Sequence, residues 1–557
     1  MTQALNIYLA QLNPTVGAIK ENAAAIAAAH ARAHAAGADL MVTPELSVIG
    51  YPPEDLVMKP FFQREAEKAV HALAKLTAGE GSPAMLVGSC WVIDGALYNV
   101  VLLLDGGEIT ATIIKYQLPN YGVFDEKRVF KAATTLQDPI DFRGLKLGVM
   151  ICEDMWFAES AAHAKVKGAD MLLVPTCSPY ESDKHNERLK HAKNRVLETG
   201  LPLVFVNQMS GQDELVFEGA SYVLDQSGAV EVQMKAWSEQ EYLTKWQKGP
   251  EGCRCITHHL ERVPEGLEAI YQAMVLGLRD YVRKNHFPGV VLGLSGGVDS
   301  ALSAAVAVDA LGADKVDCVM MPSKYTGDES LSDAALNASL LGVNYTTIAI
   351  SPGVKAFDDM LSGAFEGMEP DTTEENIQSR LRGMILMALS NKFGRMVLTT
   401  GNKSEMSVGY ATLYGDMCGG YSVLKDVYKT TAFELCRWRN SHVPEGGFGP
   451  SGEVIPDTII TKPPTAELRA DQRDDDSLPP YEALDDMLRC LVDDEMSAQE
   501  VVARGHSEQE VARIEHLLYI AEYKRRQSPP GVKLTRRNYG RDRRYPITNG
   551  FRSARRK

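Results

Sequence analysis

Short apolar runs that suit β-strands alternate with helical runs along most of the chain, and this alternation restricts the fold more than any other feature. In the first half, apolar runs such as 84–93 and 203–207 are interspersed with an alanine-rich helical run over 22–36 and another over 186–199. Such alternation is typical of α/β domains, in which helices cover the faces of a sheet. It predicts an α/β domain over residues 1–245.

The alternation breaks over residues 246–265, where glycine, proline and charged residues predict a linker. It then resumes with a very apolar run over 290–294, a helical run over 301–311 and a second apolar run over 316–321. This order predicts a doubly wound parallel sheet, Rossmann-like in outline, over residues 266–557. A chain of 557 residues is long enough for two such domains.

Charge argues against nonspecific binding to nucleic acid as the main activity, because the formal net charge is −15. The C-terminus differs from this average. From Tyr523 onward the chain has 13 lysines and arginines and one acidic residue, Asp542. We interpret this segment as a solvated basic tail that lies against an acidic neighbour. An arm that binds RNA is the alternative.

The cysteines and the apolar runs bear on location. The nine cysteines are dispersed and show no dense disulfide framework. The N-terminal residues do not resemble a leader peptide, and no run of about 18 apolar residues suits a membrane span. We expect a cytoplasmic protein with reduced thiols and no membrane partner.

A possible zinc site lies in the expected linker. Cys253 and Cys255 are followed by His258 and His259. The spacing fits none of the usual zinc motifs and would crowd four ligands into one short loop, so no metal is predicted there.

The most specific motif is GLSGGVDS, which lies between an apolar run and a helical run. Its glycines let successive backbone N–H groups point at one site, and the start of the next helix adds partial positive charge, so the loop suits a phosphate. A Walker A loop would need a lysine that is missing here. Asp299 adds a carboxylate suited to Mg²⁺. The candidate ATP-binding residues are Gly293, Leu294, Ser295, Gly296, Gly297, Val298, Asp299 and Ser300.

This loop resembles the signature of the N-type ATP pyrophosphatases, which cleave ATP to AMP and pyrophosphate while they activate a carboxylate or carbonyl. Residues 373–391 and 401–430 resemble the corresponding stretches of glutamine-dependent NAD synthetases. Within the first stretch, Asn376 and Arg380 are four residues apart and would share one face of a helix. An exposed polar face is the alternative for these two residues.

The resemblance also implies roles for single residues. It implies that Thr400 contacts ATP and that Glu405 is both a second Mg²⁺ carboxylate and a contact of deamido-NAD. Asn376 and Lys524 are implied as further deamido-NAD contacts, although a plain surface lysine is the alternative for Lys524. Asp416 and Lys429 are implied to lie near the substrates, and a cation such as Lys429 suits a triphosphate.

A separate set of residues lies in the first half. Glu45, Lys115 and Cys152 each follow an apolar run, so they can meet at the same edge of the predicted sheets. Together they resemble the Glu-Lys-Cys triad of the nitrilase superfamily. The resemblance implies a nitrilase-like αββα sandwich and amide hydrolysis with Cys152 as nucleophile. It also implies a supporting role for Glu126, for which a structural role is the alternative.

The glutaminase domains of the same synthetases suggest residues for glutamine. The resemblance implies that Tyr121, Ser178 and Lys184 bind it. Cys177 stands where the family usually has alanine, which predicts a difference in local packing.

The resemblance covers essentially the whole chain, and it implies the activity of a glutamine-dependent NAD synthetase. Deamido-NAD would be amidated to NAD through an adenylate, with ATP and Mg²⁺, and glutamine would supply the ammonia. The family also implies a homo-oligomer. One alternative is a GMP-synthetase-like amidation, against which the Glu-Lys-Cys set argues. The others are an RNA-binding or tRNA-modifying protein and a stand-alone amidase with a decayed second domain.

Overall fold

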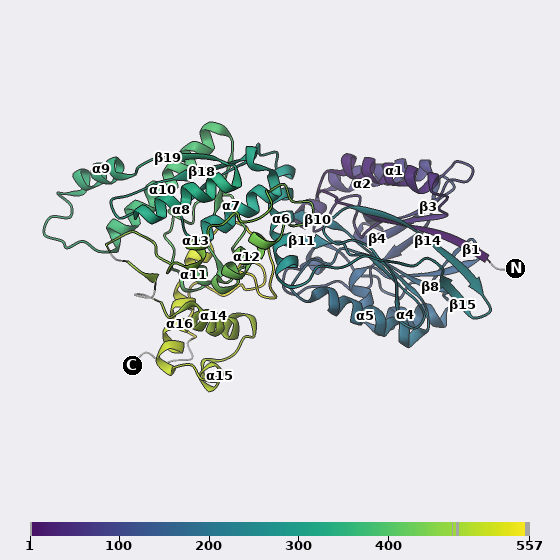
Figure 1. The fold of residues 1–557 in the computed structure, drawn as a ribbon. Helices are drawn as coiled ribbons and strands as arrows, with labels where there is room; N and C mark the ends of the chain where they lie inside the picture. Colours follow the sequence, from purple (N-terminus) through teal and green to yellow (C-terminus); the bar gives the residue numbers. More distant parts are fainter. Residues whose placement is uncertain (1–2, 471, 475–477, 552–557) are drawn as a thin grey trace. The chain divides into compact units, whose positions relative to one another are not determined.

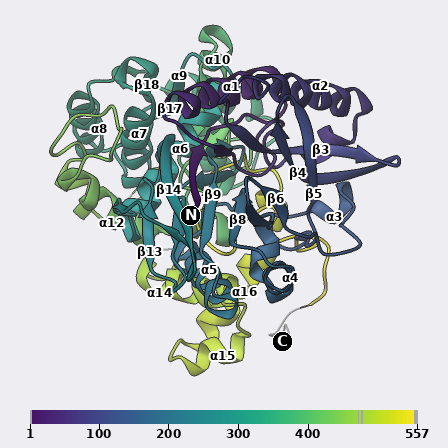
Figure 2. The ribbon, with the colours of Figure 1, turned by 90° about the vertical axis from the view of Figure 1, so that its right-hand side faces the viewer.

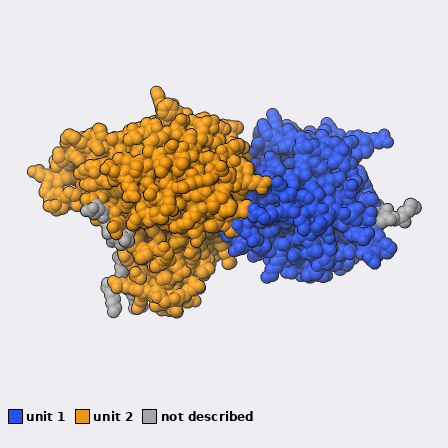
Figure 3. Space-filling view, viewed as in Figure 1, with its two compact units in different colours: residues 1–265 blue, residues 266–557 orange. Residues whose placement is uncertain are grey.

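The computed structural model describes residues 3–470, 472–474 and 478–551. The chain forms two compact units, residues 1–265 and residues 266–557 (Figure 3). No helix in the described part of the chain combines the length and the apolar character that a membrane span needs.

Unit 1 contains two seven-stranded sheets. In the first, with strand order β15-β14-β1-β2-β3-β4-β5, the central strand β2 is parallel to both of its neighbours. Its strands are β1 (Gln3–Gln11), β2 (Leu40–Val42), β3 (Ala84–Ile93), β4 (Ala96–Asp105), β5 (Glu108–Ile114), β14 (Gln240–Gly249) and β15 (Gly252–Cys255).

The second sheet has the order β16-β13-β12-β9-β8-β7-β6, in which β7, β8 and β9 are parallel. Its strands are β6 (Ile140–Phe142), β7 (Leu145–Val149), β8 (Met171–Thr176), β9 (Leu203–Asn207), β12 (Tyr222–Leu224), β13 (Val230–Gln233) and β16 (His259–Leu260). A separate hairpin consists of β10 (Met209–Gln212) and β11 (Leu215–Glu218).

Helices cover the outer face of each sheet (Figure 1). The helices α1 (Ile19–Ala35) and α2 (Pro60–Leu76) pack on the first sheet, while α4 (Ala158–Val166) and α5 (Lys184–Thr199) pack on the second. A quarter turn shows α1 and α2 on one side of unit 1 and α4 on the opposite side (Figure 2). The predicted αββα sandwich is therefore confirmed.

Strand β1 illustrates how the sequence builds these layers. Leu5, Ile7 and Leu9 point into the core between the two sheets, whereas Tyr8 and Ala10 point into the core beneath the helices. Successive side chains of a strand face opposite sides, so a strand buried on both faces is apolar throughout. The apolar runs in the sequence are such strands.

The segment expected to be a linker is folded into unit 1. Strand β14 pairs with β1 along its whole length, and β15 pairs with β14. Gly252, at φ +103°, lies at the turn between β14 and β15. The glycines and proline of this segment therefore mark a hairpin, and the prediction of a linker over 246–265 does not match the structure.

Unit 2 has a parallel five-stranded sheet with the order β19-β18-β17-β20-β21. Its strands are β17 (Val290–Gly293), β18 (Val316–Met320), β19 (Asn344–Thr347), β20 (Met396–Thr399) and β21 (Tyr421–Ser422). The chain leaves β17 in one direction and returns to its other side at β20, as in a doubly wound sheet, so this prediction is also confirmed. The point where the direction reverses lies between β17 and β20.

Helices and irregular segments make up the rest of unit 2. The helices of unit 2 are α6 (Gly266–Lys284), α7 (Val298–Leu311), α8 (Asp328–Leu341), α9 (Ser351–Leu361), α10 (Thr372–Phe393), α11 (Lys403–Val408), α12 (Lys429–Ser441), α13 (Asp457–Thr461), α14 (Tyr481–Leu488), α15 (Ala498–Ala503), α16 (Glu508–Ile520) and α17 (Glu522–Arg525). In unit 1, a short helix α3 spans Glu126–Val129.

The basic C-terminus lies against acidic residues, as expected, but part of it is buried rather than solvated. Lys533 is buried and pairs with Asp542 at 2.8 Å, and buried Arg543 pairs with Glu522 at 2.8 Å. Carboxylates within the domain thus compensate several of these charges. The last basic residues, Arg552, Arg555, Arg556 and Lys557, lie outside the described residues.

Candidate active sites

The three triad residues of unit 1 all follow strands and are buried. Glu45 follows β2, Lys115 directly follows β5, and Cys152 begins a single turn, residues 152–156, shortly after β7. Glu45 and Lys115 are fully buried, and Cys152 is 6% exposed. The ends of strands from both sheets thus bring the predicted residues into one region of the sandwich.

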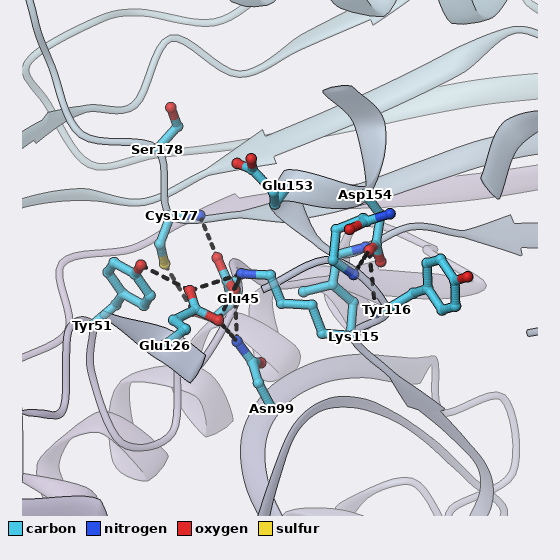
Figure 4. A network of polar contacts seen from close by, with 12 residues as sticks. Glu45, Tyr51, Asn99, Lys115, Tyr116, Glu126, Glu153, Asp154, Cys177 and Ser178 are labelled. Atoms are coloured by element: carbon cyan, nitrogen blue, oxygen red, sulfur yellow. Dashed lines mark hydrogen bonds and ion pairs between the residues drawn. The ribbon is translucent and has the colours of Figure 1, made fainter. Parts of the chain in front are cut away.

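Lys115 is the centre of a buried ionic network (Figure 4). Its Nζ donates to Glu45 Oε1 at 2.6 Å and to the two oxygens of Glu126 at 2.8 and 3.0 Å. Tyr51 donates its hydroxyl to Glu126 Oε1 at 2.9 Å. One ammonium group is therefore shared by two carboxylates. Buried charges are usually paired and hydrogen-bonded in this way, because an unpaired buried charge is costly.

Burial and neighbouring charges shift the pKa values of the groups in this network. Burial lowers the pKa of Lys115, but the charges of Glu126 and Glu45 outweigh it and raise that pKa well above its usual value. Burial raises the pKa of Glu126 to about 7 despite the opposing effect of Lys115. Burial, together with the charge of Glu45, also raises the pKa of the Cys152 thiol. The resting thiol is consequently neutral and needs a base to become a nucleophile.

Two further residues hold Glu45: Asn99, which the sequence reasoning missed, and Cys177, for which it predicted only a difference in packing. Asn99, in the middle of β4, donates from Nδ2 to Glu45 Oε1 at 2.7 Å and to Glu126 at 3.4 Å. The backbone N–H of Cys177 donates to Glu45 Oε2 at 3.1 Å, and its thiol donates to the Glu45 carbonyl at 2.9 Å. The only sequence signal for Asn99 was a polar residue within an apolar run.

A carboxylate holds the turn that begins at Cys152. Cys152 has φ +48°, a conformation that non-glycine residues seldom adopt. Asp154 accepts hydrogen bonds from the backbone N–H groups of Ile151, Tyr116 and Gln117 at 3.0, 3.2 and 2.7 Å. These bonds tie the turn to the chain that follows Lys115.

The three predicted glutamine-binding residues border this region. Tyr121 donates its hydroxyl to both oxygens of Glu153 at 3.1 Å, and its side chain is about half exposed. Lys184, at the start of α5, places Nζ 4.8 Å from the ring centre of Trp156. Both contacts involve the turn 152–156. Ser178 is buried just after β8, next to the residue that donates to Glu45.

In unit 2, the GLSGGVDS loop connects β17 to α7. Gly296 has φ +80°, and a Cβ atom there would lie 2.4 Å from the carbonyl oxygen of Ser330. Ser300 Oγ lies 3.1 Å from Ser295 Oγ and donates to the carbonyl of Gly297 at 3.0 Å. Glycine is thus required at 296, and the loop closes tightly upon itself.

This loop forms one wall of a cavity of about 280 Å³. The cavity lies where the strand order reverses, which is the usual ligand position in open α/β sheets. All eight residues of the motif line it. Among the other residues of the lining are Thr400, Glu405, Asp416 and Lys429, together with Arg382 and Lys462, which the sequence reasoning missed.

Lys429 joins the two predicted Mg²⁺ carboxylates. Its Nζ donates to Asp299 Oδ2 at 2.5 Å and to Glu405 Oε1 at 3.2 Å. Burial raises the pKa of Glu405 to about 8 even though Lys429 opposes the rise. Asn402 also donates to Asp299, at 3.0 Å. Two carboxylates from separate elements therefore already converge on a single cation.

Asn376 and Lys524 are not part of this cavity lining. Asn376 accepts a hydrogen bond from the hydroxyl of Thr412 at 2.9 Å. Lys524 donates to the carbonyls of Gly409 and Ala411 at 2.8 and 2.6 Å. Both residues instead support the loop that leads from α11 to Asp416.

Known proteins show the same two-part organisation. Residues 7–245 match the carbon-nitrogen hydrolase family, and residues 270–528 match the NAD synthase family. The glutamine-dependent NAD(+) synthetase of Rhodobacter capsulatus is 49% identical over 552 residues, which cover 99% of this chain and 100% of the relative. This chain belongs to the glutamine-dependent NAD(+) synthetases.

Other members of the glutamine-dependent NAD(+) synthetases match over similar lengths. The Xylella fastidiosa synthetase is 44% identical, over 99% of this chain and 100% of its own length. The Acinetobacter baumannii synthetase, solved in complex with ADP, is 39% identical with a TM-score of 0.78, over 99% and 100% of the two chains. The Cytophaga hutchinsonii synthetase is 22% identical with a TM-score of 0.82, over 98% of each chain, and shows the same fold. The resemblance inferred from the motifs is confirmed.

Proposed function

We propose that this chain amidates deamido-NAD to NAD, consuming ATP and glutamine and releasing AMP, pyrophosphate and glutamate. The observation that carries the proposal is the cavity of unit 2, where a phosphate-type loop faces two carboxylates that share one cation. The nitrilase-type residues of unit 1 supply the means to release ammonia. Membership of the family and the ADP complex of the A. baumannii relative support the same activity.

In unit 1, we propose that Cys152 attacks the amide carbon of glutamine. Because the thiol is neutral at rest, Glu45 takes its proton during the attack and returns it to the departing ammonia. Lys115, held as a cation, stabilises the oxyanion that develops on the former carbonyl oxygen. Water activated by Glu45 then releases glutamate from the thioester. Tyr121, Ser178 and Lys184 bind the glutamine.

In unit 2, the proposed ATP site is the GLSGGVDS loop with Thr400. Its backbone N–H groups and the start of α7 hold phosphate oxygens. Asp299 and Glu405 fit Mg²⁺, since they are hard oxygen donors that already converge on one cation. When bound, Mg²⁺ would supply positive charge against the triphosphate. Lys429 keeps the two carboxylates together and offers an ammonium group to the phosphates.

The acceptor is proposed to lie beside Glu405. The nicotinate carboxylate of deamido-NAD attacks the α-phosphorus of ATP and pyrophosphate leaves, after which ammonia displaces AMP from the adenylate. Because Asn376 and Lys524 both support the loop between α11 and Asp416, we propose that deamido-NAD lies along that loop.

The direct test follows the nitrogen atom. Purified protein with ATP, Mg²⁺, deamido-NAD and glutamine labelled with ¹⁵N in its amide should form NAD that carries the label in its carboxamide, with one AMP for each NAD. Mass spectrometry measures the label and chromatography the nucleotides. Hydrolysis of glutamine without NAD formation would contradict the proposed acceptor and leave only the reaction of unit 1.

Glu126 should give glutamine hydrolysis an acidic limb near pH 7, the pKa of its carboxyl group. Below that pH Glu126 is protonated, so Lys115 pairs with Glu45 alone and makes Glu45 a weaker base. The rate should therefore fall as the pH falls through 7. Glu126→Gln makes the neutral state permanent. We expect this variant to hydrolyse glutamine about tenfold more slowly at pH 8 and at nearly the wild-type rate at pH 6.

Tyr51→Phe is the matched variant for this prediction. It removes a hydrogen bond that lowers the pKa of Glu126, so the acidic limb should move to higher pH. Initial rates of glutamate release across pH 5.5 to 9 test both variants. An acidic limb that stays in place in Glu126→Gln would assign the titration to another group.

The homo-oligomer and the cytoplasmic location stay predictions. Support for self-association comes from α9, which buries none of its residues, and from exposed apolar side chains on α9 and α10. These are Phe357, Met360, Met384, Met387 and Phe393.

A further inference from the structure

The helix that carries Glu405 is too short to define its own position. Helix α11 has six residues, Lys403–Val408, and helices of this length are not stable by themselves. Its contacts with the surrounding structure must therefore set the place of Glu405 relative to Asp299. Several of these contacts come from residues 530–543, and others come from Arg525 of α17.

The first contact point is Lys403, the first residue of α11. Its side chain is fully buried and forms an ion pair with Asp426 at 3.0 Å. Its Nζ also donates to Thr535 Oγ1 at 2.8 Å and to the carbonyl of Arg537 at 3.0 Å. Asp493 is a further partner of this ammonium, at 2.9 Å. The buried charge of Lys403 is thus compensated, and the residue connects the start of α11 to residues 535–537.

The other end of α11 contacts the same part of the chain. Ser407 Oγ and the hydroxyl of Tyr539 are 2.6 Å apart. Arg525 donates to the carbonyls of Met406 and Ser407 at 3.2 and 2.7 Å. The last carbonyls of a helix have no hydrogen-bond donor within the helix, and the helix dipole there favours a cation. Arg525 provides both the donors and the positive charge at the end of α11.

The segment 530–543 is itself firmly held. Asp426 accepts hydrogen bonds from the backbone N–H groups of Leu534 and Thr535 at 2.7 and 2.6 Å. Two ion pairs, Lys533 with Asp542 and Arg543 with Glu522, fix the rest of this segment. The match to the NAD synthase family ends at residue 528, so this segment lies beyond it.

We propose that residues 530–543, which we name the C-terminal clamp, are a positioning element that fixes α11 and thereby aligns Glu405 with Asp299. None of the clamp residues is in the lining of the cavity, so the clamp acts on the substrates only through α11. This proposal rests on the proposed roles of Glu405 and Asp299. It assigns the clamp a part in magnesium-dependent chemistry rather than in stability alone.

The test is the double variant Thr535→Val/Tyr539→Phe. It removes the side-chain hydrogen bonds of the clamp to Lys403 and Ser407, together with that of Thr535 to Asp426, and preserves the side-chain volumes. The bond from Lys403 to the carbonyl of Arg537 stays. We expect the Mg²⁺ concentration that gives half-maximal ammonia-driven NAD formation to rise about tenfold, since both side-chain hydrogen bonds of the clamp to α11 are lost. Tyr545→Phe is the matched control, because the Tyr545 ring contacts Arg543 and Tyr519 rather than α11.

Hydrogen exchange gives a readout that does not depend on turnover. In the double variant, amides of residues 403–408 should exchange faster than in the wild type, while those of β17 stay protected. Faster exchange with an unchanged Mg²⁺ requirement would reduce the clamp to a structural role and overturn the proposal. Unchanged exchange would overturn it as well. Glu405→Gln tests the premise separately: a wild-type Mg²⁺ requirement in that variant would contradict the proposed Mg²⁺ role of Glu405, on which the clamp proposal rests.

Discussion

Replacing Cys152 with alanine is expected to stop NAD formation from glutamine and to leave NAD formation from ammonium salts at the wild-type rate. The thiol is the proposed nucleophile of the triad, since Lys115 is held as a cation and Glu45 acts as the base, and loss of such a nucleophile costs at least about 10³-fold. The two reactions are compared with saturating ATP, Mg²⁺ and deamido-NAD, while NAD and glutamate are measured together.

The neighbouring thiol provides the control. Cys177 is also buried beside Glu45, but its single S–H faces the Glu45 carbonyl at 2.9 Å and the side-chain oxygen of Gln208 at 3.2 Å. Cys177→Ala keeps the backbone N–H that donates to the Glu45 carboxylate, so glutamine hydrolysis should change by no more than a few-fold. Glutamine-driven synthesis that survives in Cys152→Ala, or that disappears in Cys177→Ala, would contradict the assignment of the nucleophile.

The triad could be predicted because each of its residues follows an apolar run. In an α/β fold, strand ends gather at edges, so three polar residues at strand ends are candidates for one site without knowledge of their pairing. Asn99 illustrates the limit of this reasoning. It lies within a strand, 54 residues from its partner Glu45, and only the register of β4 brings the two together.

The errors in the sequence reading have a common physical cause. Glycine, proline and charge indicate where the chain turns or meets water, but not what it then pairs with. The glycines near residue 250 turn a hairpin whose partner strand begins at Gln3. The C-terminal segment contacts buried carboxylates, some of them distant in sequence. One is Asp426, which accepts a hydrogen bond from the backbone N–H of Thr535. Such long-range partners are visible only in the folded chain.

Lys429 shows the same limit at the second site. The sequence reading placed it near the substrates as a phosphate contact. The structure adds that it bridges Asp299 and Glu405, which are 130 and 24 residues away along the chain. Its role is therefore coupled to that of both carboxylates, and substitutions of the three residues should not be additive.

Replacing Asp299 with asparagine is expected to produce the reverse of the Cys152 result. NAD and AMP formation should fall by roughly 10³-fold with either nitrogen source, because the variant loses a charged ligand of the proposed Mg²⁺ site and a partner of Lys429. Glutamine hydrolysis in the absence of ATP should continue, since none of the triad residues changes. Asparagine has nearly the shape of aspartate, so the packing around the loop is retained.

Stability is the competing explanation for such a loss, because the buried Lys429 would lack one of its two carboxylates. Thermal unfolding of Asp299→Asn and of Asp358→Asn, an exposed carboxylate on α9, distinguishes the two explanations. Activity lost well below the unfolding temperature is a loss of chemistry.

If Asp299→Asn still forms NAD from ammonium at the wild-type rate, the carboxylate pair is not the metal site. The loop would then bind ATP by its backbone alone, and the glutaminase assignment in unit 1 would stand unchanged, since it depends on separate residues.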